Sequence, residues 1–293
     1  MGSPVCANKR ELAMPELPEV ETVRRGLTAQ VVGRRISKVE VGRERTVRRT
    51  SARSVIDGLT GTTITAVNRR GKYLLCPLDS GDELMMHLRM SGRVLISPRG
   101  APRPPHTHVV MHLDGNPPHE LWFIDPRTFG EVVVFDPRNV AVELPEVAKM
   151  GIDPIADGLS RPQFGELLAR RSRQIKALLL DQHVVAGIGN IYCDESLHLA
   201  GVRWDRRSDS LKPREVTKLH AAIMRVLGEA IEAGGSTLAD TQYVGVDGEG
   251  GWFQLHHRVY DRAGQRCLTC EKADIVRVAV AGRGTHFCPR CQS

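Results

Sequence analysis

Four cysteines near the C-terminus constrain the fold of this chain more than any other feature. Cys267 and Cys270 form one Cys-x2-Cys pair, and Cys288 and Cys291 form a second pair after seventeen intervening residues. Two such pairs can bring four thiolates together around a tetrahedral Zn²⁺. Because four sulfur ligands leave no position for water, we expect one structural zinc that stabilises a segment too small to hold its own core. The alternative is a pair of disulfides, which is typical of secreted chains.

The N-terminal half shows first a helical and then a strand-like pattern of apolar residues. Apolar residues recur every three or four positions from Val20 to Val31, which predicts a helix that begins near Pro18 and stops at Gly33. Short apolar runs separated by turn residues follow, and they predict an antiparallel β-sandwich or barrel. These runs are Ile64–Val67, Tyr73–Leu75, Leu84–His87, Val94–Ile96, Val109–Leu113, Leu121–Ile124 and Val132–Phe135.

Helical spacing returns in the second half, after a stretch interrupted by Pro137, Pro145 and Pro154. We expect short helices near residues 164–169, 175–180 and 191–199, and a longer helix from Pro213 to Gly234. The whole chain is therefore expected to be a multidomain α+β protein. It would have an N-terminal helix plus antiparallel β-sandwich, a helical domain, and a C-terminal four-cysteine zinc finger.

An excess of basic residues favours a polyanionic partner. The chain has 41 Lys and Arg against 34 Asp and Glu, which gives a net charge of +7 and a pI near 9.2. Such a surface attracts phosphates, although a solvated basic face without a partner would give the same balance. The glycine-rich segment from Gly187 to Asn190 lies between two expected helices. Its free backbone amides could bind a phosphate, but an ordinary interhelical turn has the same composition.

Nothing in the sequence indicates export or membrane insertion. No apolar run approaches the ~20 residues that span a bilayer. Residues 1–13 lack the apolar stretch of a secretory signal. We therefore expect a cytoplasmic protein that does not bind membranes.

Three segments together resemble the formamidopyrimidine-DNA glycosylase family. The first is Pro15-Glu16-Leu17-Pro18-Glu19-Val20-Glu21, the second runs from Gly187 to Tyr192, and the third from Cys267 to Cys291. They are similar to the N-terminal signature, the helix–two-turn–helix and the zinc finger of that family. The resemblance implies a monomeric base-excision-repair enzyme that binds double-stranded DNA containing oxidised bases, among the cell's nucleoid DNA. It would remove 8-oxoguanine and formamidopyrimidines through an N-terminal proline iminium and then cut the strand by β,δ-elimination.

The resemblance also implies roles for particular residues. Pro15 would be the nucleophile and Glu16 the general acid/base at the sugar ring, with Glu19 supporting the site. Lys72 would contact the phosphate next to the lesion and belong to the catalytic set. The remaining positions would hold the DNA backbone (His87, Asn190 and Arg283) or fill the gap left by an extruded nucleotide (Met90, Arg127 and Phe129). The segment 234–253 corresponds to the loop that reads the flipped base, but no residue in it has an assigned role.

The implied domains are an N-terminal catalytic β-sandwich domain at 15–145, a helix–two-turn–helix DNA-binding domain at 146–250 and a zinc-finger β-hairpin at 251–293. Residues 1–14 are the largest departure, because an internal Pro15 is a tertiary amide without a nucleophilic nitrogen. We expect Met14 to be the true start and the preceding segment to be non-native or misannotated. Smaller departures are Arg89, Thr128, Asp261 and Glu271. Family members more often carry Gly at three of these positions and often Arg at the Thr128 position.

Two other interpretations remain open. An endonuclease VIII-like glycosylase would prefer oxidised pyrimidines, although Leu17 and the Val20-Glu21 ending favour the purine enzyme. A catalytically silent, zinc-dependent protein that binds damaged DNA would retain the DNA contacts while the extension masks Pro15.

Overall fold

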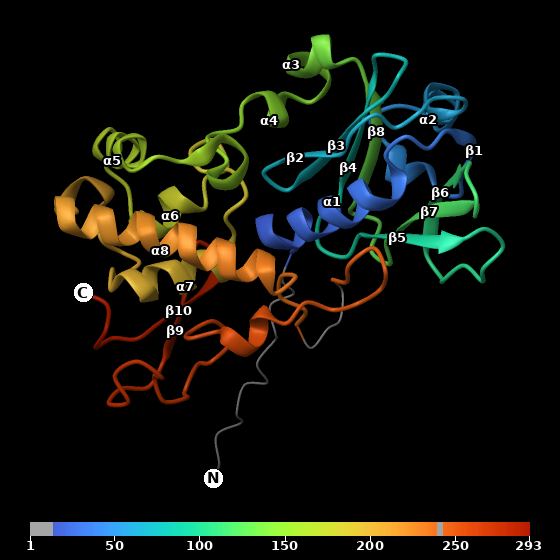
Figure 1. Ribbon diagram of the computed structural model, residues 1–293. Coiled ribbons are helices and arrows are strands. Elements are labelled where there is room, and N and C mark those ends of the chain that lie inside the picture. Colours follow the sequence, from blue (N-terminus) through green and yellow to red (C-terminus); the bar gives the residue numbers. More distant parts are fainter. Residues whose placement is uncertain (1–13, 239–242) are drawn as a thin grey trace.

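The computed structural model describes residues 14–238 and 243–293. Apart from Met14, the expected N-terminal extension lies outside the described residues, as do residues 239–242 of the expected base-reading loop. Two β-sheets occupy one side of the molecule and a group of helices the other (Figure 1). The predicted arrangement of a sandwich, a helical domain and a C-terminal zinc finger is confirmed.

The β-sandwich consists of two four-stranded sheets in which every pairing is antiparallel. One sheet has the order β1–β6–β7–β5 (Ile36–Val41, Thr107–Leu113, His119–Ile124, Arg93–Pro98). The other has the order β2–β3–β4–β8 (Asn68–Arg70, Tyr73–Pro77, Glu83–His87, Glu131–Phe135). Six of the seven predicted strands are present. The prediction for Ile64–Val67 was wrong, since this run forms only an isolated bridge between Ile64 and Leu78.

Helix α1 (Leu17–Val31) connects the two halves of the molecule. Its inward face, including Val20 and Val31, is fully buried in the core that both sheets share. Its first residue, Leu17, instead belongs to the core of the helical half. The N-terminus of α1 therefore lies at the junction of the two domains, and a second helix, α2 (Ala52–Leu59), covers the sandwich elsewhere.

The helical half is built around two long helices, α7 and α8, which pack against each other. The predicted helices are confirmed as α5 (Arg161–Ala169), α6 (Ile175–Leu179), α7 (Asn190–Ala200) and α8 (Pro213–Glu232). Two single-turn helices, α3 (Val140–Glu143) and α4 (Pro145–Ala148), lead into this half from the sandwich. Helix α7 is buried from Ile191 to His198, so it has no solvent-facing side over that stretch.

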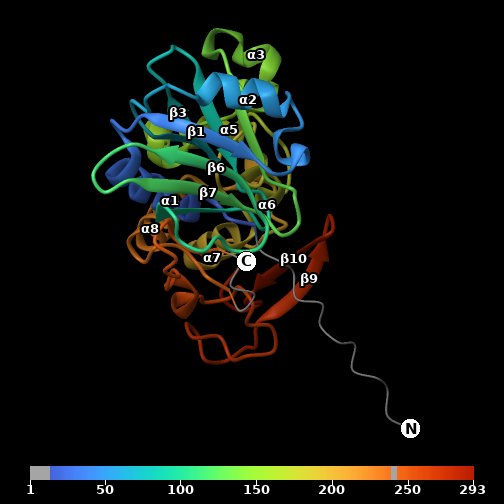
Figure 2. The ribbon, with the colours of Figure 1, turned by 90° about the vertical axis from the view of Figure 1, so that its right-hand side faces the viewer.

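The C-terminal part ends in a two-stranded hairpin of β9 (Val276–Val280) and β10 (Arg283–Phe287). Its turn consists of Ala281 and Gly282, both at positive φ (49° and 76°), as a two-residue hairpin turn requires. Figure 2 shows the hairpin beside α7, toward the lower right of the view and apart from the two sheets. Arg283 directly follows this turn and is the first residue of β10.

The four positions at which the sequence departs from the family pattern share one backbone conformation. Arg89, Thr128, Asp261 and Glu271 have φ between 52° and 56°, where a Cβ is unfavourable and glycine is not. We expect Glu271→Gly, at an exposed site, to raise the free energy of unfolding by about 0.5–1 kcal/mol. Glu166→Gly in α5 is the control and should lower it by about 1 kcal/mol. Equal losses in both variants, measured by denaturant unfolding, would contradict this explanation.

Candidate active site

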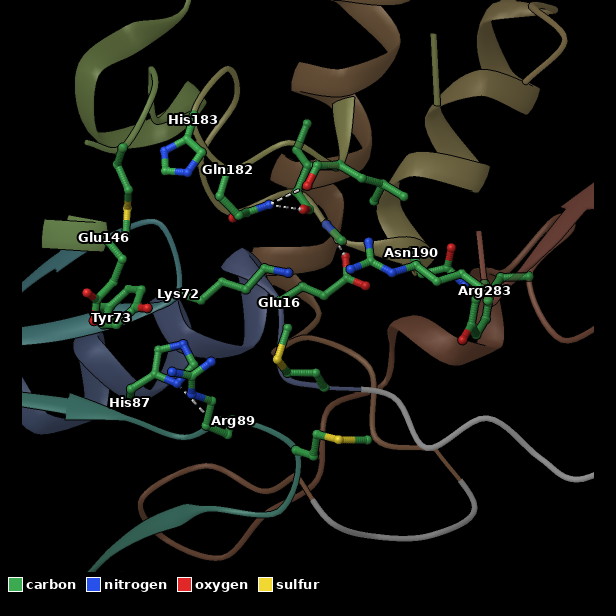
Figure 3. A pocket seen from close by; sticks show the side chains of 18 residues that line it. Glu16, Lys72, Tyr73, His87, Arg89, Glu146, Gln182, His183, Asn190 and Arg283 are labelled. Atoms are coloured by element: carbon green, nitrogen blue, oxygen red, sulfur yellow. Dashed lines mark hydrogen bonds between the residues drawn. The ribbon is translucent and has the colours of Figure 1, made fainter. Parts of the chain in front are cut away.

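A cavity of about 610 Å³ lies where the two domains and the hairpin meet. Its polar lining comes from distant parts of the chain: Glu16 at the start of α1, Lys72 and His87 from the sandwich, Asn190 at the start of α7 and Arg283 from β10. Figure 3 shows the Lys72 side chain extending toward Glu16. Five residues predicted from separate motifs are therefore brought to one cavity.

The carboxylate of Glu16 is held by the first turn of α7. It accepts hydrogen bonds from the backbone N–H groups of Gly189 (2.8 Å), Ile191 (2.9 Å) and Tyr192 (3.4 Å). A helix N-terminus is the expected place for a negative group. Burial raises the pKa of Glu16 to about 7, while Lys72 and the backbone amides oppose that rise. The group can therefore both hold and release a proton near neutral pH.

Glycine is required where the α6–α7 turn passes the start of α1. A Cβ added at Gly189 would lie 2.3 Å from Cδ of Glu16, and one at Gly187 would lie 2.7 Å from Cδ1 of Leu17. The backbone of Leu17 also donates a hydrogen bond to the Gly187 carbonyl (3.0 Å). The turn that the sequence marked as a possible phosphate site thus serves here to hold the Glu16 carboxylate.

Pro15 is buried directly before Glu16, with Met14 still attached to its nitrogen. It lines a narrow hollow together with Glu19, while Met14 is among the residues that line the larger cavity. Oε2 of Glu19 accepts the backbone N–H of Glu16 (2.9 Å), so this carboxylate fixes the peptide that follows Pro15. Burial raises the pKa of Glu19.

Lys72 and His87 carry the cationic and imidazole groups of the cavity. Burial lowers the pKa of Lys72, and the nearby Glu16 carboxylate opposes that change. Burial, together with the charge of Arg89 and other cations, holds the pKa of His87 well below its usual range. Nδ1 of His87 accepts the backbone N–H of Arg89 (3.2 Å). A neutral His87 therefore carries its proton on Nε2.

A buried ion-pair network that sequence reasoning missed holds the turn with Lys72. Asp153 accepts hydrogen bonds from the backbone N–H of Gly71 (2.8 Å) and from the Arg69 guanidinium (2.5 Å). Arg69 also donates to Glu21 on α1 (3.0 Å). The network joins α1, the β2–β3 turn and the interdomain segment. No periodic pattern marks these residues in the sequence, because charged residues are usually exposed.

The three predicted gap-filling residues lie on two neighbouring loops. Met90 and Phe129 line one cavity of about 380 Å³, and the Arg127 guanidinium lies 4.7 Å from the centre of the Phe129 ring. The Asp125 carboxylate joins the loops, because it accepts hydrogen bonds from the Ser91 hydroxyl (2.5 Å) and from the backbone N–H groups of Arg127 (3.1 Å) and Gly130 (2.6 Å). The structure therefore places the trio on two loops that Asp125 joins.

Helix α7 anchors the hairpin that carries Arg283. The Asn190 side chain donates to the Gly284 carbonyl (2.8 Å), next to Arg283. Asp194 accepts from Nζ of Lys176 (2.5 Å) and from the backbone N–H of His286 (2.8 Å). One further acid on α7 binds the backbone amides at the start of the zinc-finger part: Glu195 accepts from Arg258, Val259 and Tyr260. Sequence reasoning missed these acids, although an Asp-Glu pair inside a helix with no exposed face is a signal that could have found them.

The four C-terminal cysteines form a ligand set for zinc. Their Sγ atoms all lie within 4.8 Å of one another, and two pairs are 3.8 Å apart: Cys267 with Cys291, and Cys270 with Cys288. A tetrahedron with metal–sulfur bonds of about 2.3 Å has edges of about 3.8 Å, so the residues fit Zn²⁺. The same distances exclude disulfides, whose sulfur atoms would be about 2 Å apart.

Removing the metal is expected to unfold the C-terminal part. Its buried cluster of Val259, Ile275 and the cysteines is small, and zinc binding to such segments contributes about 10–16 kcal/mol. Dialysis against a strong chelator should make residues 258–293 sensitive to trypsin while the rest of the chain resists, and added zinc should reverse the change. A zinc-free protein whose C-terminal part resists trypsin would contradict a structural metal.

No helix among the described residues is long and apolar enough to cross a membrane.

Comparisons with known proteins match the chain from Met14 onward. Family models match residues 14–132 (formamidopyrimidine-DNA glycosylase N-terminal domain), 150–242 (the H2TH domain of the same enzyme) and 264–293 (zinc finger found in FPG and IleRS). The formamidopyrimidine-DNA glycosylase of Salinispora arenicola is 44% identical over 95% of this chain and 96% of its own length. That of Thermus thermophilus is 42% identical over 95% and 98%.

Solved structures agree with these relatives. The Lactococcus lactis Fpg in complex with DNA containing an abasic site is 37% identical, with a TM-score of 0.84 over 95% of this chain and 99% of that one. A MutM complex with DNA containing carbocyclic 8-oxo-G is 37% identical, with a TM-score of 0.84 over 95% and 100%. The chain belongs to the formamidopyrimidine-DNA glycosylase family.

Proposed function

We propose that this protein is a bifunctional DNA glycosylase and AP lyase of base excision repair that removes 8-oxoguanine and formamidopyrimidines. The observation that carries the proposal is the position of Glu16. It follows Pro15 directly, is held by the amides of α7 and faces Lys72 in a cavity at the domain junction. Family membership adds to this: solved complexes of relatives contain DNA with Fapy-dG and with carbocyclic 8-oxo-G.

The proposed reaction uses the Pro15 nitrogen as a secondary-amine nucleophile. Its lone pair forms a bond to C1′ of the damaged nucleotide as the bond from C1′ to the base breaks, and the base leaves with a proton. Protonation of O4′ then allows the bond from C1′ to O4′ to break, and the opened sugar carries an iminium that acidifies the C2′ proton. Loss of that proton expels the 3′ phosphate, a second elimination expels the 5′ phosphate, and water then releases the proline. Glu16, which can carry a proton at neutral pH, serves as the acid/base at the sugar ring.

The nucleophile requires that Met14 be absent. While Met14 is attached, the Pro15 nitrogen is a tertiary amide and has no basic lone pair. We therefore propose that the active enzyme begins at Pro15. Since Met14 lines the cavity that Glu16 and Lys72 share, its removal would also enlarge that cavity.

The remaining side chains fit contacts to a DNA duplex. Lys72, the Nε2–H of His87, Asn190 and Arg283 can each donate to phosphate oxygens around the cavity. Met90, Arg127 and Phe129 can fill the gap left by an extruded nucleotide, which offsets the cost of unstacking. We propose that one monomer acts on one lesion in the cell's nucleoid DNA.

An excision assay on matched duplexes tests this function. The chain beginning at Pro15 should release 8-oxoguanine and formamidopyrimidine opposite cytosine faster than thymine glycol or dihydrouracil, with strand cleavage at the lesion. A preference for the pyrimidine lesions would favour the endonuclease VIII-like alternative. Tight lesion binding without base release would favour a silent DNA-binding protein.

A further inference from the structure

A chain of buried polar groups leads from Glu19 to the first residues of the zinc-finger part. Oε1 of Glu19 accepts hydrogen bonds from the Tyr192 hydroxyl and from the Ser236 backbone N–H (2.6 Å). The Ser236 hydroxyl lies 3.2 Å from the Tyr192 hydroxyl and 3.2 Å from Nε2 of His257. All four side chains are at least 94% buried. This series of hydrogen-bonded groups is therefore shielded from water along its length.

The backbone beside these buried polar groups approaches Glu19 so closely that it leaves no room for a side chain at Gly235. Gly235 has φ of +81°, and a Cβ there would lie 2.8 Å from Oε1 of Glu19. His257 itself follows the short helix η5 (Phe253–His256) and directly precedes Arg258, whose backbone N–H binds the α7 acid Glu195. The groups that hold Glu19 thus come from two segments that are both fixed to the helical domain.

Glu19 links these groups to Pro15, the proposed nucleophile. Its other oxygen accepts the N–H of Glu16, and that N–H belongs to the peptide formed with Pro15. A peptide group is planar, so an oriented N–H also orients the proline carbonyl and Cα. Covalent attack requires the reacting atoms to be placed closely, and small misplacements are costly.

We propose that His257 is a positioning residue, which acts through Ser236 and Glu19 to aim the Pro15 nitrogen at C1′. The proposal rests on the proposed function. It assigns His257 no contact with the DNA or the damaged base. It therefore predicts that the loss of His257 slows every step that needs the nucleophile, including reaction with a site that has already lost its base.

The test compares three variants of the chain that begins at Pro15. His257→Leu removes the polar contact to Ser236, and His257→Gln keeps a polar group within similar reach. His256→Leu is the matched control. His256 is the neighbouring residue, but it is exposed and is not one of the hydrogen-bonded polar groups that lead to Glu19. Each is mixed with duplex DNA containing a preformed abasic site, and the rate of borohydride trapping is measured beside the rate of 8-oxoguanine excision.

His257→Leu should slow both rates about five- to tenfold, which corresponds to the loss of about one buried hydrogen bond. DNA affinity and zinc content should be unchanged. His257→Gln should recover most of the loss, and His256→Leu should match the parent protein. If His257→Leu slows excision but not trapping, or behaves like His256→Leu, the proposal is wrong. If the parent protein itself gives no trapped adduct, the proposed function fails instead.

Ser236→Ala provides a second route should His257→Leu not fold. It removes the same contact with little change in volume and keeps the backbone N–H that binds Glu19. Combined with His257→Gln, which keeps a polar group within reach of Ser236, it should cost about as much as it does alone. Combined with His257→Leu, it should add little further loss, because both changes break the same contact. If the losses caused by Ser236→Ala and His257→Leu are fully additive, the two residues do not act through one contact and the proposal is wrong.

Discussion

Replacing Glu16 with glutamine is expected to slow base excision by about 10²- to 10⁴-fold, the usual contribution of a general acid or base. Glutamine preserves the size of the side chain and one oxygen for the α7 amides, but it cannot carry a transferable proton. The measurement is a single-turnover rate with 8-oxoguanine opposite cytosine. Glu166→Gln, on the exposed face of α5, is the control and should leave the rate unchanged.

The pH dependence of the same variant gives an independent check. Because burial raises the pKa of Glu16 to about 7, the group is protonated below that pH and loses its proton above it. If it donates a proton at the sugar ring, excision by the parent protein falls as pH rises through about 7. That falling limb should be missing in Glu16→Gln. A limb that persists in the variant would assign the proton to another group.

Gly189→Ala is expected to abolish most activity although it replaces none of the proposed catalytic residues. The added methyl would lie 2.3 Å from Cδ and 2.4 Å from Oε1 of Glu16, so the carboxylate must move. A displacement of about 1 Å in a catalytic group can cost about 100-fold in rate, and overpacking of this kind costs about 1–3 kcal/mol of stability. Single-turnover excision and thermal unfolding measure the two effects.

Gly228→Ala is the matched control for that substitution. Gly228 lies within α8, and a Cβ there would meet nothing within 4 Å. Alanine in a helix should therefore stabilise the protein by about 0.5–1 kcal/mol and leave excision unchanged. A Gly189→Ala variant as active as Gly228→Ala would show that the close fit of the α7 N-terminus around the Glu16 carboxylate is not needed for excision.

Regular elements with a clear apolar period were predictable from the sequence. The long helix from Pro213 is one example, since apolar residues recur at helical spacing from Val216 to Ile231 and most of them pack in one core. The run Ile64–Val67 failed because four apolar or small residues fit a strand and a buried extended segment equally well. In the structure the run forms one isolated bridge, between Ile64 and Leu78, which directly follows β3.

The candidate site was predictable as a set of residues but not as a geometry. The motifs identified Pro15, Glu16 and the α6–α7 turn separately, and family resemblance placed them in one site. The hydrogen bonds from the turn's amides to the Glu16 carboxylate join residues more than 170 positions apart in the sequence. The charged groups that organise the site, such as Asp153 and Asp194, were missed because acidic residues are normally exposed.

The central claim is that Pro15 becomes the covalent nucleophile once its nitrogen is free. It is tested most directly by mixing the protein with duplex DNA containing 8-oxoguanine, adding sodium borohydride and mapping the reduced adduct by peptide mass spectrometry. One sample is the full chain and the other a chain produced from Met14, whose removal exposes Pro15. We predict an adduct on Pro15 in the second sample, and in the first only in molecules that have lost residues 1–14. An adduct on a lysine, or none from a folded, zinc-loaded chain that begins at Pro15, would contradict the account.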